Sequence, residues 1–130
     1  MHLYLIRGLP GSGKSTFAAT LARGLDCCHL EQDAYLYTPE GEYLWTESRM
    51  GYAYRACLRD TRAEMELGHP VVVSNVFPLN RSLKRYEKLA EEFGYRVTYA
   101  VIENRRGGVN IHDVPEEVLE SMRASFKVQL

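Results

Sequence analysis

The sequence predicts an α/β fold, a three-layer sandwich in which helices cover both faces of a parallel sheet of four or five strands. Short apolar runs alternate with helical patterns along the whole chain. The connections between these runs are long enough for right-handed crossovers between parallel strands. The chain has 130 residues, of which 45% are hydrophobic and 25% charged, so we expect one globular domain over residues 1–130.

Each expected strand is a short apolar run close to a turn signal. The first comprises residues 3–6, the second 28–31, the third 71–74 and the fourth 96–102. The third is the clearest, because its valines are β-branched and favour strands. Residues 127–130 are a candidate for a fifth strand.

Helical periodicity predicts helices over residues 15–24, 47–67 and 81–93, each ending at or just before a glycine. Proline at position 115 opens a last helix, since proline is favoured at the first helical position. Residues 34–46 combine aromatic residues with a proline and a glycine, which predicts an irregular excursion.

Charge and cysteine content narrow the function classes. The net charge is −1, so any nucleic-acid binding needs a local basic patch. Cys27, Cys28 and Cys57 lack metal-ligand spacing and predict apolar packing in a reducing compartment. No apolar run is long enough to cross a bilayer, and the first residues do not resemble a signal peptide. We therefore expect a cytoplasmic protein without membrane or obligate protein partners, from a bacterial, phage or eukaryotic source.

A glycine-rich motif links the first strand to the first helix. Residues 8–15, GLPGSGKS, fit the pattern G-x-x-x-x-G-K-S/T at every fixed position. Glycines let backbone amides surround a phosphate, Lys14 reaches the β- and γ-phosphates, and the Ser15 hydroxyl is a Mg²⁺ ligand. The motif predicts a nucleoside triphosphate site with ATP and Mg²⁺. The expected binding residues are Gly8, Leu9, Pro10, Gly11, Ser12, Gly13, Lys14, Ser15 and Thr16.

Aromatic and basic residues gather in the middle of the chain and suggest an acceptor site. Six aromatic residues fall between positions 35 and 54, and Arg55, Arg59 and Arg62 follow at helical spacing. Aromatic rings stack on nucleobases and arginines contact phosphates, which favours a nucleic acid or nucleotide as acceptor. Tyr35 and Arg55 are the predicted contacts. Packing of the excursion and a solvated helix face are the alternatives.

Four segments in order resemble small P-loop kinases related to the kinase domain of phage polynucleotide kinase and to NEDD4-binding-protein-2-like proteins. They are residues 4–16, 30–33 (LEQD), 71–77 (VVVSNVF) and 110–117 (NIHDVPEE). The resemblance spans nearly the whole chain. It implies the strand order 2-3-1-4 and an ATP-dependent kinase with an alcohol group as acceptor.

The resemblance assigns roles to individual residues. It makes Asp33 the base that accepts the proton of the attacking hydroxyl, with a helix or turn cap as the alternative. Asn75 stands where the pattern has an aspartate, so it keeps hydrogen-bonding ability without the charge. We expect it to orient Asp33, a basic lid residue or the substrate, with a polar strand end as the alternative. Arg105 and Arg106 fall where these kinases place a lid whose arginines reach the transferring phosphoryl group, although Val109 shifts their register. A solvated basic loop is the alternative. Leu36 replaces an arginine of the phage enzyme, which argues against recognition of a 3′-phosphate in that enzyme's manner.

Three functions follow from these patterns. The first is a kinase that phosphorylates a polynucleotide or nucleotide hydroxyl, either a 5′-hydroxyl or a hydroxymethylated base in DNA. The second is a P-loop ATPase or nucleotide-binding module that transfers phosphate to water alone. The third is a small-molecule kinase. Asp33 favours a kinase, because proton removal from an acceptor hydroxyl needs a base.

Overall fold

The computed structural model describes residues 1–104, 114–126 and 128. Its sheet has four parallel strands in the order β2-β3-β1-β4. Their bounds are β1 His2–Arg7, β2 Cys28–Glu31, β3 Val71–Asn75 and β4 Arg96–Val101. This order confirms the prediction. The candidate fifth strand at 127–130 lies, apart from Val128, outside the described residues.

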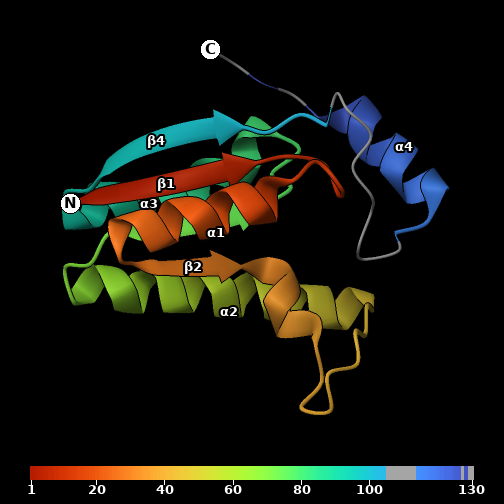
Figure 1. Cartoon of the computed structure of the whole chain (residues 1–130), viewed down its shortest axis with the longest axis horizontal. Coiled ribbons are helices and arrows are strands. Elements are labelled where there is room, and N and C mark those ends of the chain that lie inside the picture. Colours follow the sequence, from red (N-terminus) through yellow and green to blue (C-terminus); the bar gives the residue numbers. More distant parts are fainter. Residues whose placement is uncertain (105–113, 127, 129–130) are drawn as a thin grey trace.

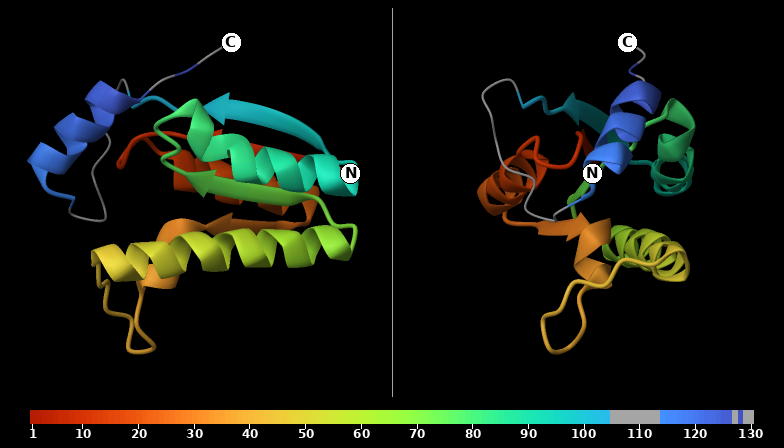
Figure 2. Two further views of the ribbon diagram at one scale, coloured as in Figure 1. Left: turned by 180° about the vertical axis from the view of Figure 1, so that it is seen from behind. Right: turned by 90° about the vertical axis from the view of Figure 1, so that its right-hand side faces the viewer.

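Helices lie on both faces of the sheet (Figure 1). They are α1 Lys14–Leu25, α2 Glu47–Glu66, α3 Lys84–Phe93 and α4 Glu116–Ser125. Helix α1 covers one face, and α2 and α3 cover the other (Figure 2). Helix α4 lies beyond the carboxyl ends of the strands. Because α1, the sheet and the α2–α3 pair stack in succession, the fold is the predicted three-layer sandwich.

Alternation along β1 builds the two halves of the core. Leu3 and Leu5 pack with residues of α2 and α3, including Cys57 and Tyr86. Ile6 points to the other face and packs with Ala18 and Ala22 of α1. Successive strand side chains point to opposite faces, so one strand supplies both layers.

Two predicted segments differ in detail from the structure. The helix predicted over 81–93 is divided into a 3₁₀ turn, η2, at Asn80–Leu83 and the helix α3. The excursion begins with a 3₁₀ helix, η1, at Gln32–Leu36, and a β-bridge between Tyr37 and Tyr43 closes the loop that follows. A 3₁₀ turn of four residues is too short for its period of about 3.0 residues to be distinguished from the period of about 3.6 of an α-helix. Periodicity therefore did not separate η2 from α3.

The three cysteines are free thiols; Cys57 is buried and the other two are half-buried. Burial raises the pKa of the Cys57 thiol, so this side chain acts as an apolar packing residue. Among the described residues, no helix is both long and apolar enough to cross a membrane.

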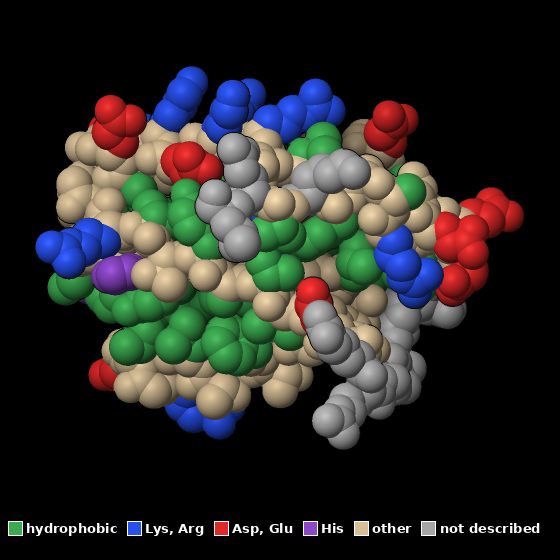
Figure 3. Space-filling view, turned by 90° about the horizontal axis from the view of Figure 1, so that it is seen from above, with side chains coloured by type: hydrophobic (Ala, Val, Ile, Leu, Met, Phe, Trp, Pro, Cys, Tyr) green, Lys and Arg blue, Asp and Glu red, His purple; other side chains and the backbone are tan. Residues whose placement is uncertain are grey.

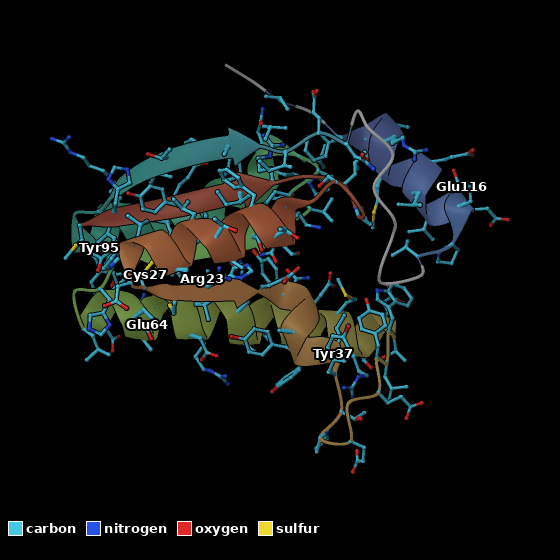
Figure 4. All side chains as sticks on the ribbon, in the orientation of Figure 1. Arg23, Cys27, Tyr37, Glu64, Tyr95 and Glu116 are labelled. Atoms are coloured by element: carbon cyan, nitrogen blue, oxygen red, sulfur yellow. The ribbon has the colours of Figure 1, made fainter. Side chains whose placement is uncertain are left out.

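All four strands point the same way, so the segments that follow them gather at one edge of the sheet. In Figure 4, Tyr37 and Glu116 lie at this edge, whereas Arg23, Cys27, Glu64 and Tyr95 lie at the opposite end of the molecule. In open α/β sheets, ligands bind at the carboxyl edge. The carboxyl edge of the sheet is therefore the expected place for a binding site.

Candidate active site

The loop after β1 has the geometry of a P-loop, and we call residues 8–16 the cradle. Gly11 and Gly13 have φ angles of 79° and 91°, in the left-handed region that favours glycine. The backbone amide of Ser12 donates to the carbonyl of Leu9 at 3.0 Å and closes the turn. A Cβ added at Gly8 would lie 2.8 Å from the carbonyl oxygen of Ile102, so only glycine fits between the cradle and the end of β4.

Lys14 lies inside this cradle. Its side chain is only 4% exposed, and burial lowers its pKa, while the carboxylates of Glu31 and Asp33 oppose this shift. Burial removes water from the Lys14 ammonium group. The negative charge of a phosphate would compensate for this lost solvation, which suits Lys14 to phosphate binding.

Glu31 is a site residue to which the sequence patterns assigned no role. It ends β2, and its Oε1 accepts a hydrogen bond from the Ser15 hydroxyl at 2.5 Å. The Ser15 hydroxyl and the Glu31 carboxylate thus lie side by side near Lys14. The LEQD motif is the sequence signal that contains Glu31, but the resemblance assigns a role to Asp33 alone.

Asp33 lies in η1, directly after β2, and lines a cleft at the carboxyl edge. The Tyr43 phenol lies beside its carboxylate. Burial, with the Asp33 charge as a second cause, raises the pKa of Tyr43 to about 12. Tyr43 therefore keeps its proton near neutral pH.

Asn75 connects the end of β3 to the segment that carries Asp33. Its Oδ1 accepts a hydrogen bond from the backbone amide of Gln32 at 2.7 Å, and its side chain is buried. The amide side chain thus fixes the backbone immediately before Asp33. A neutral Asn suits this role, since a buried carboxylate at this point would require a compensating charge.

Arg7 holds the far wall of the cleft. Its guanidinium donates two hydrogen bonds to the Phe77 carbonyl, at 3.0 and 2.8 Å. Phe77 has a φ of 46°, which is uncommon for a residue other than glycine. Because Arg7 is the last residue of β1, the same strand end supports both the cradle and this wall.

The cleft has a volume of about 580 Å³, within the usual range for small-ligand sites. Its lining is mostly aromatic and aliphatic. The lining residues are Pro10, Gln32, Asp33, Tyr43, Trp45, Met50, Tyr54, Asn75, Val76, Phe77, Pro78, Ser82, Val114, Pro115, Val118 and Met122. Pro10 of the cradle and Asp33 therefore face the same space.

Two other predicted site residues, Tyr35 and Arg55, do not line this cleft. The Tyr35 hydroxyl donates to Oδ2 of Asp60 at 2.6 Å, and its ring packs against the core. Arg55 is exposed on α2. Neither is among the residues that line the cleft. Arg105 and Arg106, with the rest of the predicted lid at 107–113, lie outside the described residues.

Comparison with known proteins identifies the family. The chain matches an AAA domain family, AAA_33, over residues 3–129. It belongs to this family. A parallel sheet with the order 2-3-1-4 and a P-loop after β1 gives this AAA domain the fold of P-loop kinases.

Solved structures of several kinases share the fold. A candidate kinase from Chloroflexus aurantiacus is 17% identical with a TM-score of 0.65, over 78% of this chain and 58% of that one. A chain of the Pnkp1/Rnl/Hen1 complex is 22% identical with a TM-score of 0.66, over 92% and 38%. A sugar kinase from Janibacter is 20% identical with a TM-score of 0.64, over 100% and 80%. The AAA domain thus spans under two thirds of the first two chains.

Proposed function

We propose that this AAA domain is an ATP-dependent kinase that transfers the γ-phosphate to a hydroxyl of a polynucleotide or nucleotide. The observation that carries the proposal is the shared cleft. Asp33, Pro10 of the cradle and the aromatic residues Tyr43, Trp45 and Tyr54 line one space. A base, a phosphate donor site and a surface for stacking are the three parts that such a transfer needs.

The residues of the cradle fit a nucleoside triphosphate with Mg²⁺. The buried hydroxyl of Ser12 has no hydrogen-bond partner among the described residues, and the cradle is too narrow at Gly8 for any side chain. Lys14 would contact the β- and γ-phosphates. Ser15 and Glu31 would hold Mg²⁺ directly or through water, since this ion prefers oxygen ligands and keeps several waters. When bound, Mg²⁺ would supply charge stabilisation to the transferring phosphoryl group.

A second hollow beside the cradle suits the base of the nucleotide. It has a volume of about 450 Å³ and lies between the cradle, the end of β4 and Phe126. Asn104 donates from Nδ2 to the Gly11 carbonyl at 3.0 Å and so fixes the boundary between hollow and cradle. Donor and acceptor would then approach Lys14 from two sides.

In the proposed reaction the acceptor oxygen attacks the γ-phosphorus while the bond to the β-phosphate oxygen breaks. The hydroxyl proton passes to the Asp33 carboxylate, and ADP leaves. Asn75 holds the backbone before Asp33 in place through Gln32. The predicted lid arginines, Arg105 and Arg106, would neutralise charge on the transferring group.

Lining chemistry favours a nucleoside as the part of the acceptor inside the cleft. Among its described lining residues, Asp33 is the charged one and no Lys or Arg is present. Tyr43, Trp45 and Tyr54 offer rings for a base. The Asp33 carboxylate would repel an acceptor phosphate placed beside it, so we place the phosphates of the acceptor outside the cleft.

The three free thiols suit a reducing compartment, and we place the protein in the cytoplasm.

A small-molecule kinase is the second candidate. The limited volume of the cleft supports it, as does the shared fold of the Janibacter sugar kinase. The acceptor panel below separates the two candidates directly.

The test is a transfer assay with γ-³²P-labelled ATP. The panel contains single-stranded DNA and RNA with 5′-hydroxyls, nucleosides, hydroxymethylated DNA, sugars and a sample without acceptor. Lys14→Ala protein, prepared in parallel, controls for contaminating kinases. We expect label on a polynucleotide or nucleotide. Label on a sugar would establish the second candidate, and release of free phosphate with every acceptor would establish an ATPase and contradict both.

A further inference from the structure

A row of basic side chains runs along the outer face of α3 and the turn before it. Arg81, Lys84, Arg85 and Lys88 recur at intervals of three and four residues, which places them on one face of the helix. All four are exposed, while Tyr86, Leu89 and Ala90 of the same helix are buried. We call these four residues the α3 ridge. Figure 3 shows Lys and Arg side chains gathered along one rim of the molecule.

The α3 ridge is not neutralised by neighbouring carboxylates. Within the described part of the chain, none of its four cations forms an ion pair. The arginines of α2 behave differently. Arg59 pairs with Asp60 at 2.9 Å, and Arg62 pairs with Glu92 at 2.7 Å. The basic surface that the sequence suggested on α2 is therefore largely compensated, and the uncompensated one lies on α3.

The α3 ridge begins at the mouth of the cleft. Ser82 lies between the ridge residues Arg81 and Lys84 in the sequence and lines the cleft. Tyr54 of α2 also lines the cleft. The Arg85 guanidinium lies 5.7 Å from the centre of the Tyr54 ring, so one side chain belongs to both surfaces. From Arg81 to Lys88 the ridge extends roughly 10 Å at the helical rise of 1.5 Å per residue.

Cleft and ridge have complementary chemistry. The cleft provides aromatic rings and a carboxylate, which suit a neutral base and a hydroxyl. The ridge provides fixed positive charge directly outside. A nucleic-acid strand combines neutral bases with a phosphate at every nucleotide, whereas an acidic protein has no base for the rings. Stacking also needs an unpaired base, which favours a single strand over a duplex.

We propose that the α3 ridge binds the phosphate backbone of a single-stranded polynucleotide whose acceptor nucleotide lies in the cleft. This proposal rests on the proposed function and narrows its acceptor from a nucleotide to a strand. The ridge contributes affinity for the strand but does not touch the reacting atoms.

The test compares two variants with equal loss of charge. Lys84→Gln/Lys88→Gln removes two ridge cations and leaves Arg85, which contacts the cleft, in place. Arg23→Gln/Arg96→Gln removes two exposed cations, one at the end of α1 and one at the start of β4, both at the other end of the sheet. Circular dichroism and melting temperature confirm that each variant is folded.

Binding of a fluorescent single-stranded oligonucleotide is measured against salt concentration. Each lost phosphate contact lowers the slope of log K against log salt by about 0.7, so the ridge variant is expected to lose about 1.4 and to bind roughly tenfold or more weakly at 50 mM salt. The control variant is expected to bind like the wild type. The proposal would be overturned if both variants bound the oligonucleotide equally weakly, or if neither bound it more weakly than the wild type. It would also be overturned if the wild type bound poly-glutamate as tightly as the oligonucleotide.

Transfer assays separate failure of the ridge from failure of the proposed function. We expect the ridge variant to show a raised KM for the oligonucleotide, with kcat and transfer to a single nucleoside unchanged. If the wild type phosphorylates a nucleoside or oligonucleotide and the ridge variant matches it on both, the ridge proposal is wrong and the kinase proposal stands. If the wild type phosphorylates no hydroxyl at all, the proposed function is wrong, whatever the ridge binds.

Discussion

The proposed nucleotide side and the proposed acceptor side of the site are built in different ways. The cradle is one continuous stretch, residues 8–16, whose contacts come mainly from its own backbone. The acceptor cleft is assembled from η1, the excursion, α2, the segment after β3 and α4. The backbone geometry of a continuous motif requires particular residue types, so the motif can be recognised from the sequence. A cleft made of side chains from separate segments depends on tertiary packing, so its residues can vary while its shape is kept.

The largest expected effect falls on the nucleotide side. Lys14→Ala should abolish transfer, a loss of roughly 10³-fold or more, because the cation meets charge on the transferring phosphate. The fold should persist, since burial already lowers the pKa of Lys14 and its removal relieves a buried charge. Calorimetry with MgATP and turnover assays provide the measurement. Undiminished binding and turnover would contradict the assignment.

Arg7 tests whether the two sides share one support. Arg7→Met leaves the Phe77 carbonyl without its charged donors, which should destabilise the protein by about 2–3 kcal/mol in urea unfolding. The KM for the acceptor should rise more than the KM for MgATP, because the lost bonds hold the cleft wall. Arg23→Met, at an exposed position in the last turn of α1, is the matched control. An unchanged free energy of unfolding would show that the Arg7 contacts do not support the wall.

Trp45 tests the acceptor side in isolation. Its ring lines the cleft and is 60% exposed. If it stacks on a base, Trp45→Ala should raise the acceptor KM roughly 5- to 150-fold, equivalent to about 1–3 kcal/mol, with MgATP affinity unchanged. Trp45→Phe should retain most of the affinity. Tyr52→Ala removes an exposed ring that does not line the cleft and should have no effect. Equal effects of the Trp45 and Tyr52 changes would contradict the stacking role.

The smallest expected effect concerns the sheet beneath both sides. His29 Nε2 lies 2.6 Å from the Ser74 Oγ and links β2 to β3, and burial lowers the pKa of His29. The unfolded chain therefore binds the proton first as pH falls, so stability present above the ordinary value of 6.5 is lost as pH falls through the folded pKa. Melting temperatures at pH 7.5 and 5.0 should differ more for the wild type than for His29→Gln. An equal difference would exclude His29 as the cause.

Much of the fold could be predicted because its signals are local. Apolar runs, glycine stops and the P-loop indicated where the described strands lie, right-handed crossovers left few topologies, and the resemblance to P-loop kinases supplied the strand order. The division at η2 was missed, because residues 80–83 continue the helical spacing of α3.

The acceptor side could be predicted only in kind. Aromatic residues between 35 and 54 indicated a cluster, but the turn of the excursion decides that Tyr43 faces the cleft while Tyr35 bonds to Asp60. Glu31 approaches Ser15 only because β2 packs beside α1. The neutralisation of Arg62 likewise depends on Glu92, thirty positions away on another helix. Such long-range pairings have no local signature.

The central claim is that Asp33 removes the proton of an acceptor hydroxyl, and one measurement tests it most directly. Single-turnover transfer by Asp33→Asn, with MgATP affinity and melting temperature recorded on the same protein, should show a rate reduced by roughly 10²–10⁴ and little change in the other two. The amide keeps the size of the carboxylate and loses its basicity. A helix or turn cap predicts the reverse, a lower melting temperature with a nearly normal rate in the folded fraction. An unchanged transfer rate would remove Asp33 from the chemistry and contradict the account.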